Sequence, residues 1–244
     1  MKPARKTVWL FDLDNTLHDA GAHIFGALNR SMSAYVQREL RLDAAQADTL
    51  RRGYWLRYGA TLIGLVRHHG VRAEHFLHDT HRLPGLENQV SGHRHDHAVL
   101  RRLPGRKLVL TNAPREYALR VLGALGIAQA FDDVLCIEDM VMFGHWRPKP
   151  DARMLRRLVA RLGVPASRCV LVEDTLVHQK AARRVGMRTV WMQRYARRSD
   201  ATGPVVARWS MRPAYVDMVV RGLKPLERWS VANAADSDPV GAPT

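Results

Sequence analysis

Hydrophobic and polar residues follow two different patterns in the first third of the chain. Residues 7–12, TVWLFD, form an apolar run with the length of a buried strand. From about residue 18 to residue 90, apolar residues recur at helical spacing, and glycine or proline ends each helical segment. The first such segment places apolar residues at Ile24, Leu28, Met32, Tyr35 and Val36. We therefore expect a strand followed by an all-helical insert.

From about residue 91 onwards, helical segments alternate with short apolar runs. Gly126, Gly163 and Gly186 each follow a helical segment directly, at a position where helix C-termini favour glycine. The runs that we expect to be strands are KLVLTN at 107–112, DDVLCIED at 132–139, SRCVLVED at 167–174 and MRTVWM at 187–192. Short apolar strands separated by helices are typical of an α/β fold with a doubly wound, Rossmann-like parallel sheet.

The same pattern predicts two domains and a tail. The α/β core comprises residues 1–17 and 91–230, and the helical insert comprises residues 18–90, directly after the first strand. Within the core, residues 212–229 are expected to add an edge strand and a short helix. Residues 231–244 are small and polar, and we expect them to form a disordered tail.

The composition raises the question of a nucleic-acid partner. The 46% hydrophobic and 25% charged residues are typical of a globular protein, but the formal net charge is +15. A charge of this size invites a nucleic-acid-binding interpretation. All but six of the 38 basic residues are arginines, and they are scattered over most predicted helices. We favour a solvated, arginine-rich surface and expect no nucleic-acid partner.

Three features indicate a cytoplasmic protein. No apolar stretch approaches the roughly 18 residues of a membrane helix, so we expect no membrane association. The N-terminal MKPARKTVWLFDLD runs from basic residues into acids without a small-residue cleavage site, which argues against a signal peptide. Cys136 and Cys169 fall inside apolar runs, which favours buried free thiols in a reducing compartment.

Polar residues cluster where the predicted strands end, which is where an open parallel sheet binds ligands. They are Asp12, Asp14, Thr111, Asn112, Glu173 and Asp174, and the loop HWRPKPD adds Lys149. Four carboxylates in one crevice repel one another, and a hard cation with oxygen ligands, Mg²⁺, relieves that repulsion. A metal, a lysine and hydroxyl and amide donors suit a phosphate, and a carboxylate not consumed by the metal can act as a nucleophile.

Four motifs at these positions resemble those of the haloacid dehalogenase (HAD) superfamily, in the same order. They are DLDNT at 12–16, TN at 111–112, the lysine of RPKP and VED at 172–174, and the resemblance covers about residues 7–17 and 91–192. It implies a phosphatase in which Asp12 attacks phosphorus and forms an aspartyl-phosphate. Asp14 would protonate the leaving oxygen and then activate water. An acid at position 14 is typical of phosphotransferases in this superfamily rather than of true dehalogenases.

The resemblance also implies a phosphate site, a magnesium site and a helical cap. The implied residues are Thr111, Asn112 and Lys149 for the phosphate, and Asp12, Asp174, the main-chain carbonyl of Asp14 and, through a water, Glu173 for Mg²⁺. The insert at 18–90 corresponds to the cap, which excludes water and selects the leaving group.

The DNTL motif, the cap and EDTLVHQKAARRVGM are most similar to bacterial relatives of pyrimidine 5′-nucleotidases. This similarity favours a small-molecule substrate such as UMP or CMP, with His18 and His23 at the cap entry as candidate substrate contacts. The alternatives are 2-phosphoglycolate or a sugar phosphate, a mutase reaction, and nucleic-acid binding on a hydrolase scaffold. Leu176, Val177 and His178 replace a glycine of many relatives, which either stiffens this loop or turns His178 toward the site.

Residues 68–97 are rich in histidine. His93 and His97 have a helical spacing that can bind a transition metal, but no acid or cysteine signature accompanies them. We therefore favour hydrogen-bonded or solvated histidines near the cap hinge. Thr16 is expected to support Asp14, and Trp146, beside the lysine loop, is the first aromatic residue that we suspect of contacting a substrate.

Overall fold

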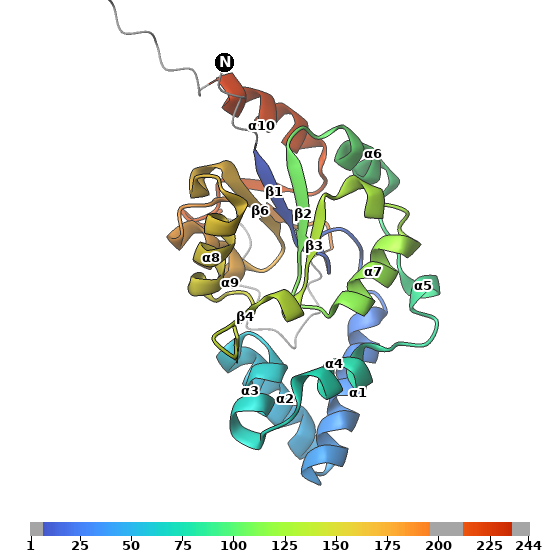
Figure 1. The fold of residues 1–244 in the computed structure, drawn as a ribbon. Helices are drawn as coiled ribbons and strands as arrows, with labels where there is room; N and C mark the ends of the chain where they lie inside the picture. Colours follow the sequence, from blue (N-terminus) through green and yellow to red (C-terminus); the bar gives the residue numbers. More distant parts are fainter. Residues whose placement is uncertain (1–6, 196–211, 236–244) are drawn as a thin grey trace, which may run out of the picture.

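The computed structural model describes residues 7–195 and 212–235, and it contains a six-stranded sheet in the order β3-β2-β1-β6-β7-β8 (Figure 1). All neighbouring strands of this sheet pair in parallel. The strands are β1 (Val8–Phe11), β2 (Arg106–Leu110), β3 (Asp133–Leu135), β6 (Cys169–Glu173), β7 (Arg188–Met192) and β8 (Met218–Val220). The chain builds one half from β1 to β3 and then returns beside β1 to build the other. The predicted doubly wound sheet is confirmed.

Alternating side chains of β1 enter two hydrophobic layers, one on each face of the sheet. Trp9 and Phe11 belong to the layer that includes residues of α6, α7 and α10, whereas Val8 and Leu10 belong to the layer under α8 and α9. These helices are α6 (Arg94–Arg102), α7 (Arg115–Ala124), α8 (Ala152–Leu162), α9 (Leu176–Arg184) and α10 (Lys224–Ala235). Because both faces are covered, β1 and residues 108–110 and 169–172 of its two neighbours are apolar, as their sequences predicted.

Four helices of the insert form a group of their own, drawn in blue to cyan in Figure 1. They are α1 (Ile24–Leu40), α2 (Ala44–Tyr58), α3 (Thr61–His69) and α4 (Ala73–His81). A separate hydrophobic cluster holds them together and includes Tyr35, Leu65 and Phe76. The next helix, α5 (Leu86–Gln89), packs on α7, and Leu86 belongs to the core layer. This packing indicates that the cap ends nearer α4 than the predicted residue 90.

Two predicted details are wrong. The chain from Asp133 forms a short β3 and a 3-10 helix (Ile137–Asp139), followed by an unpredicted hairpin of β4 (Val141–Met142) and β5 (His145–Trp146). Positive φ angles at Phe143 and Gly144 build its two-residue turn. Helix α10 continues to Ala235, because its alanine-rich end has a high helix propensity, so the predicted tail is not disordered at its start. The remainder of that tail, residues 236–244, lies outside the described residues.

The register of the central strands brings their carboxyl ends to one edge. Phe11 pairs with both Val109 and Val172, and the amide of Asp12 donates to the carbonyl of Val172 at 2.9 Å. Asp12 and Thr111 follow β1 and β2, and Glu173 is the last residue of β6, so these three residues lie next to one another. Both cysteines are buried and free. Within the described ranges, no helix is long and apolar enough to cross a membrane.

Candidate active site

Lys149 lies at the centre of the site and joins two strand ends. Its side chain is almost fully buried, and Nζ donates to Oδ1 of Asp12 at 2.6 Å and to Oε2 of Glu173 at 2.7 Å. Burial alone would lower the pKa of the ammonium group, but the two carboxylates outweigh burial and raise this pKa above its usual value. Lys149 is therefore a fixed positive charge between carboxylates from β1 and β6.

Three carboxylates lie around this lysine in an arrangement that suits a cation. Asp12, Glu173 and Asp174 can each offer an oxygen within 4.8 Å of the others, and no other group of three or more such ligands occurs among the described residues. Burial, then the charge of Glu173, raises the pKa of Asp12 to about 7, although Lys149 opposes this shift. Burial, then the charges of Glu173 and Asp12, raise the pKa of Asp174 well above its usual value. An all-oxygen group with more carboxylates than nearby cations fits Mg²⁺.

The position of Lys149 depends on Asn112. The amide Nδ2 of Asn112 donates to the carbonyl of Lys149 at 2.9 Å, and Oδ1 accepts from the amide of Lys149 at 2.9 Å. The side chain of Asn112 thus holds the lysine loop, whereas the sequence suggested a contact with phosphoryl oxygens. Thr111 lies beside it, almost fully buried, and its hydroxyl accepts from the amide of Ala113 at 3.0 Å.

Thr16 contacts the carboxylate of Asp12 and not that of Asp14. Its hydroxyl donates to Oδ2 of Asp12 at 3.3 Å, which corrects the expectation that Thr16 supports Asp14. The turn after β1 brings the side chain back, because Leu13 accepts from the amides of Thr16 and Leu17. Asp12 therefore has Lys149 on one oxygen and Thr16 on the other.

Asp14 has a different set of neighbours. Its Oδ1 lies 2.8 Å from Nε2 of His18 and accepts from the hydroxyl of Tyr117 at 2.7 Å. His18 is fully buried behind Asp14, which does not support its predicted substrate contact, and His23 lies exposed at the start of α1. No motif points to Tyr117, because its position in a helical segment is equally consistent with a residue of the hydrophobic core.

His178 lies next to the acid group, as one of the two sequence interpretations suggested. Its Nδ1 is 3.0 Å from Oε2 of Glu173. Burial would raise the pKa of Glu173, but Lys149 and His178 outweigh it and hold that pKa below its usual value. Glu173 is therefore the acid in this group that is ionised most readily.

Four other histidines, His68, His69, His75 and His78, have tyrosine or aspartate partners. The hydroxyl groups of Tyr35, Tyr54 and Tyr58 lie 2.9, 2.7 and 2.6 Å from ring nitrogens of His75, His69 and His68, respectively. His93 and His97 take part in no group of three metal ligands among the described residues. Trp146 packs against the hydrophobic cluster of the cap. The contacts of His68, His69 and His75 favour the structural interpretation for that part of the segment, whereas Nδ1 of His93 and Nε2 of His97 are buried without a hydrogen-bond partner among the described residues.

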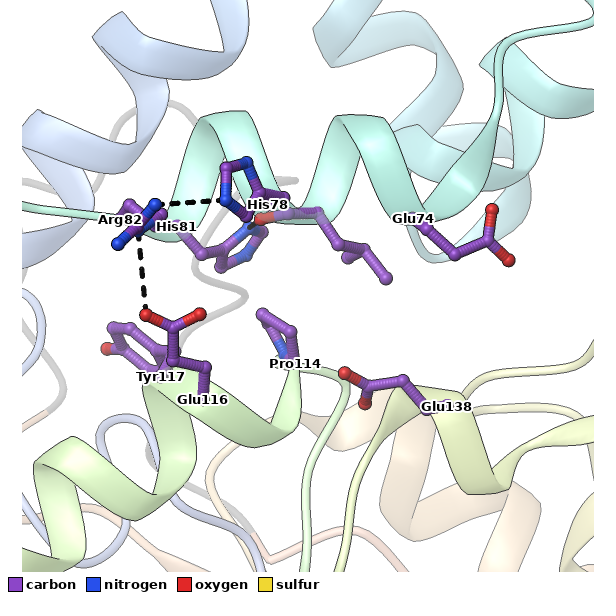
Figure 2. Close-up of a pocket in the computed structure, with 9 residues that line it drawn as sticks. Glu74, His78, His81, Arg82, Pro114, Glu116, Tyr117 and Glu138 are labelled. Atoms are coloured by element: carbon purple, nitrogen blue, oxygen red, sulfur yellow. Dashed lines mark hydrogen bonds and ion pairs between the residues drawn. The ribbon is translucent and has the colours of Figure 1, made fainter.

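A cavity of about 160 Å³ lies between α4 of the cap and the start of α7 (Figure 2). Two of its lining residues, His81 and Tyr117, connect it to Asp14. Tyr117 binds Asp14 directly, and the Asp14 charge acts on the imidazole of His81, whose pKa burial nonetheless lowers to about 4. The cavity also has the carboxylates of Glu74, Glu116 and Glu138 around it, and Arg82 pairs with Glu116 at 3.6 Å.

Comparison with known families agrees with the fold and with the arrangement of acids. A family model described as haloacid dehalogenase-like hydrolase matches residues 7–186, which is most of the chain. The chain belongs to this family of hydrolases, and the resemblance seen in its motifs is confirmed.

Three relatives illustrate the similarity. Phosphate metabolism protein 8 of Saccharomyces cerevisiae is 26% identical over 198 residues, which are 76% of this chain but only 60% of that protein. The plasmid phosphoglycolate phosphatase of Cupriavidus necator is 29% identical over 192 residues, 74% of this chain and 78% of that protein. A HAD phosphatase from Thermococcus onnurineus has a TM-score of 0.59 and 20% identity, and the match covers 91% of this chain and 97% of that one. At this identity the last match shows a shared fold alone.

Proposed function

We propose that this protein is a magnesium-dependent phosphomonoesterase that hydrolyses a small metabolite, most simply a pyrimidine nucleoside 5′-monophosphate such as UMP or CMP. The observation that carries this proposal is the buried contact of Lys149 with Asp12 and Glu173, beside Asp174. A buried lysine between carboxylates can bind an anionic phosphoryl group when a metal cation offsets the charge of the carboxylates. Two relatives whose names refer to phosphate or phosphatase activity support the same class of reaction.

Mg²⁺ would be held by Asp12, Asp174 and the main-chain carbonyl of Asp14, with Glu173 acting through a water. Bound there, it would neutralise the charge of the phosphoryl group and lower its repulsion by the acids. Lys149 contributes the second positive charge and keeps Oδ1 of Asp12 in place. Thr111 and the main chain at Asn112 would bind the phosphoryl oxygens.

The reaction has two steps. A carboxylate oxygen of Asp12 attacks phosphorus, and the bond from phosphorus to the ester oxygen breaks as Asp14 gives its proton to the leaving oxygen. Asp14, now a carboxylate, then takes a proton from water, which attacks the phosphorus of the aspartyl-phosphate. Inorganic phosphate leaves, and both carboxyl groups return to their starting states.

The charge of the cavity between α4 and α7 supports a nucleoside rather than glycolate as the leaving group. Glu74, Glu116 and Glu138 outnumber Arg82 there, so an additional carboxylate on the substrate would be repelled. Hydroxyl and amino groups would instead find acceptors. Phosphoglycolate or a sugar phosphate stays the alternative substrate, and the cytoplasm stays the predicted location.

The proposed activity is tested with an aryl phosphate and purified protein. Turnover should require Mg²⁺, and Asp12→Asn should abolish it, because an amide is a poor nucleophile. Asp48→Asn, which removes a charge from α2, is the matched control and should retain turnover. Activity that survives Asp12→Asn would overturn the assigned nucleophile.

Substrate choice is tested separately by kcat/KM over a panel of UMP, CMP, 2-phosphoglycolate and a sugar phosphate. We expect the nucleotides to rank first. The double variant Glu74→Gln, Glu138→Gln should improve 2-phosphoglycolate relative to UMP, because it removes repulsion from the cavity. Nucleotides that rank last in the unmodified protein would contradict the proposed substrate.

A further inference from the structure

The carboxylate of Asp14 is held through one of its two oxygens. Oδ1 accepts from the hydroxyl of Tyr117 at 2.7 Å and lies 2.8 Å from Nε2 of His18. Within the part of the chain that the structure describes, Oδ2 has no hydrogen-bond partner. Two bonds to one oxygen fix the plane of the carboxyl group and leave the other oxygen available.

The orientation of His18 identifies it as a donor. Its Nδ1 is buried and has no partner among the described residues, whereas Nε2 faces Oδ1 of Asp14. A proton on Nδ1 would leave a buried donor unpaired and would set the Nε2 lone pair against a carboxylate oxygen. Nε2 therefore carries the proton and donates a hydrogen bond to Oδ1 of Asp14.

Separate elements hold the two donors rigidly. His18 is fully buried and makes backbone bridges to Asp14 and Gly92, so it joins the two chain crossings between core and cap. Tyr117 is almost fully buried in the core layer on α7. The imidazole of His81 packs edge-on against the ring of Tyr117, with 5.9 Å between ring centroids.

Two side chains near Asp14, those of Tyr117 and His81, are uncharged at physiological pH. Burial and the Asp14 charge raise the pKa of Tyr117 well above its usual value, so its hydroxyl keeps its proton. His81 is neutral at physiological pH, since burial lowers its pKa to about 4. It therefore places no cation beside Asp14.

We propose that His18 and Tyr117 are positioning residues that fix Oδ1 of Asp14, so that Oδ2 exchanges the proton with the leaving oxygen and with water. This inference rests on the proposed function, because it needs Asp14 as the acid. In the first step Oδ2–H gives its proton to the ester oxygen as that oxygen leaves phosphorus. In the second step Oδ2 takes a proton from the attacking water. Oδ1 keeps both hydrogen bonds throughout.

The test compares two substrates that differ in their need for an acid. The dinitrophenolate of 2,4-dinitrophenyl phosphate leaves without a proton, whereas the alcohol of an alkyl phosphate needs one. Tyr117→Phe removes only the hydroxyl group. We expect it to lower the ratio of alkyl to aryl kcat/KM about tenfold or more, because kcat/KM reports the phosphorylation step, in which only the alkyl ester needs the proton. His18→Leu should lower the same ratio, and His18→Gln, which keeps an N–H of similar reach, should restore part of it.

Tyr35→Phe is the matched control, because it removes another buried hydroxyl group that binds a histidine, His75, in the cap. It should leave the ratio unchanged. Equal losses of kcat/KM on both substrates in Tyr117→Phe and His18→Leu would make the two residues merely structural and would overturn the inference, as would an unchanged ratio. Magnesium-dependent aryl turnover that is lost in Asp12→Asn supports the proposed function whatever the ratio does. If the unmodified protein had no magnesium-dependent aryl turnover, the proposed function and this inference would both be overturned.

Discussion

Each catalytic candidate at the strand ends is defined by its buried partners. Asp12 shares Lys149 with Glu173, so the two acids from different strands depend on one cation. Removing one member of such a buried group leaves the others uncompensated, which is costly in free energy. The site is thus assembled as a unit, and a bound cation would complete its charge balance.

Magnesium affinity should depend on pH. Asp12 has a pKa raised to about 7, so below that pH a proton competes with the metal for its carboxylate. If the metal displaces one proton, from Asp12, its apparent affinity should fall roughly tenfold for each pH unit below about 7. Titration calorimetry across this range measures it. An affinity that is constant from pH about 5 to 8 would contradict the assignment of Asp12 as a ligand.

Asn112→Ala tests the support of the lysine loop. It removes both bonds to the main chain of Lys149, so we expect kcat to fall and the free energy of unfolding to decrease by about 1–3 kcal/mol. Asn29→Ala, which removes a bond to Arg51 in the cap, is the matched control and should keep its kcat for a small aryl phosphate. Enzyme assays and chemical denaturation measure both effects, and an unchanged kcat in Asn112→Ala would contradict the positioning role.

At the scale of elements, the local pattern of apolar residues predicted the helices and strands that this pattern determines. Continuous apolar runs and the helices between them predicted the parallel sheet, and parallel strands bring their ends together, which predicted Asp12, Thr111 and Glu173 at one edge. The β4–β5 hairpin was missed, because strands of two residues leave no periodicity to detect.

The partners of individual side chains could not be predicted in the same way. The contact of Tyr117 with Asp14 depends on how α7 packs against the turn after β1, which is a tertiary property. Thr16 faces Asp12 rather than Asp14 because of the geometry of that turn, which spacing alone does not specify.

Close packing of α2 on α3 provides a test of the cap. A Cβ atom at Gly64 would overlap the ring of Tyr54, which stacks on His68 and binds His69 at 2.7 Å. Gly64→Ala should therefore lower the free energy of unfolding by about 1–3 kcal/mol. Gly53→Ala, on α2 with open space around it, should instead raise it by up to about 1 kcal/mol. Thermal denaturation compares them, and a stabilising Gly64→Ala would contradict the packing.

On the scale of the whole molecule, the positive net charge and the acidic site have opposite signs. The chain carries +15, yet three of its strand-end acids, Asp12, Glu173 and Asp174, gather in one group. A positive surface draws small phosphorylated molecules toward the protein, while a polyanion would meet the carboxylates in the crevice.

Binding to nucleic acid should accordingly be weak. We expect no specific binding of duplex or single-stranded nucleic acid at physiological salt. At low salt we expect only a weak complex, whose affinity falls steeply as salt is added. Fluorescence anisotropy in a salt titration measures this. Tight, sequence-dependent binding at physiological salt would instead favour the alternative of a nucleic-acid-binding protein on a hydrolase scaffold.

Chemical trapping of the covalent intermediate tests the central claim most directly. In Asp14→Asn, 2,4-dinitrophenyl phosphate should still phosphorylate Asp12, because its leaving group needs no proton, while water is no longer activated and the aspartyl-phosphate accumulates. Acid quenching, borohydride reduction and peptide mass spectrometry should then find homoserine at position 12, only when Mg²⁺ is present. Modification of another carboxylate, or turnover without any modification of Asp12, would contradict the account.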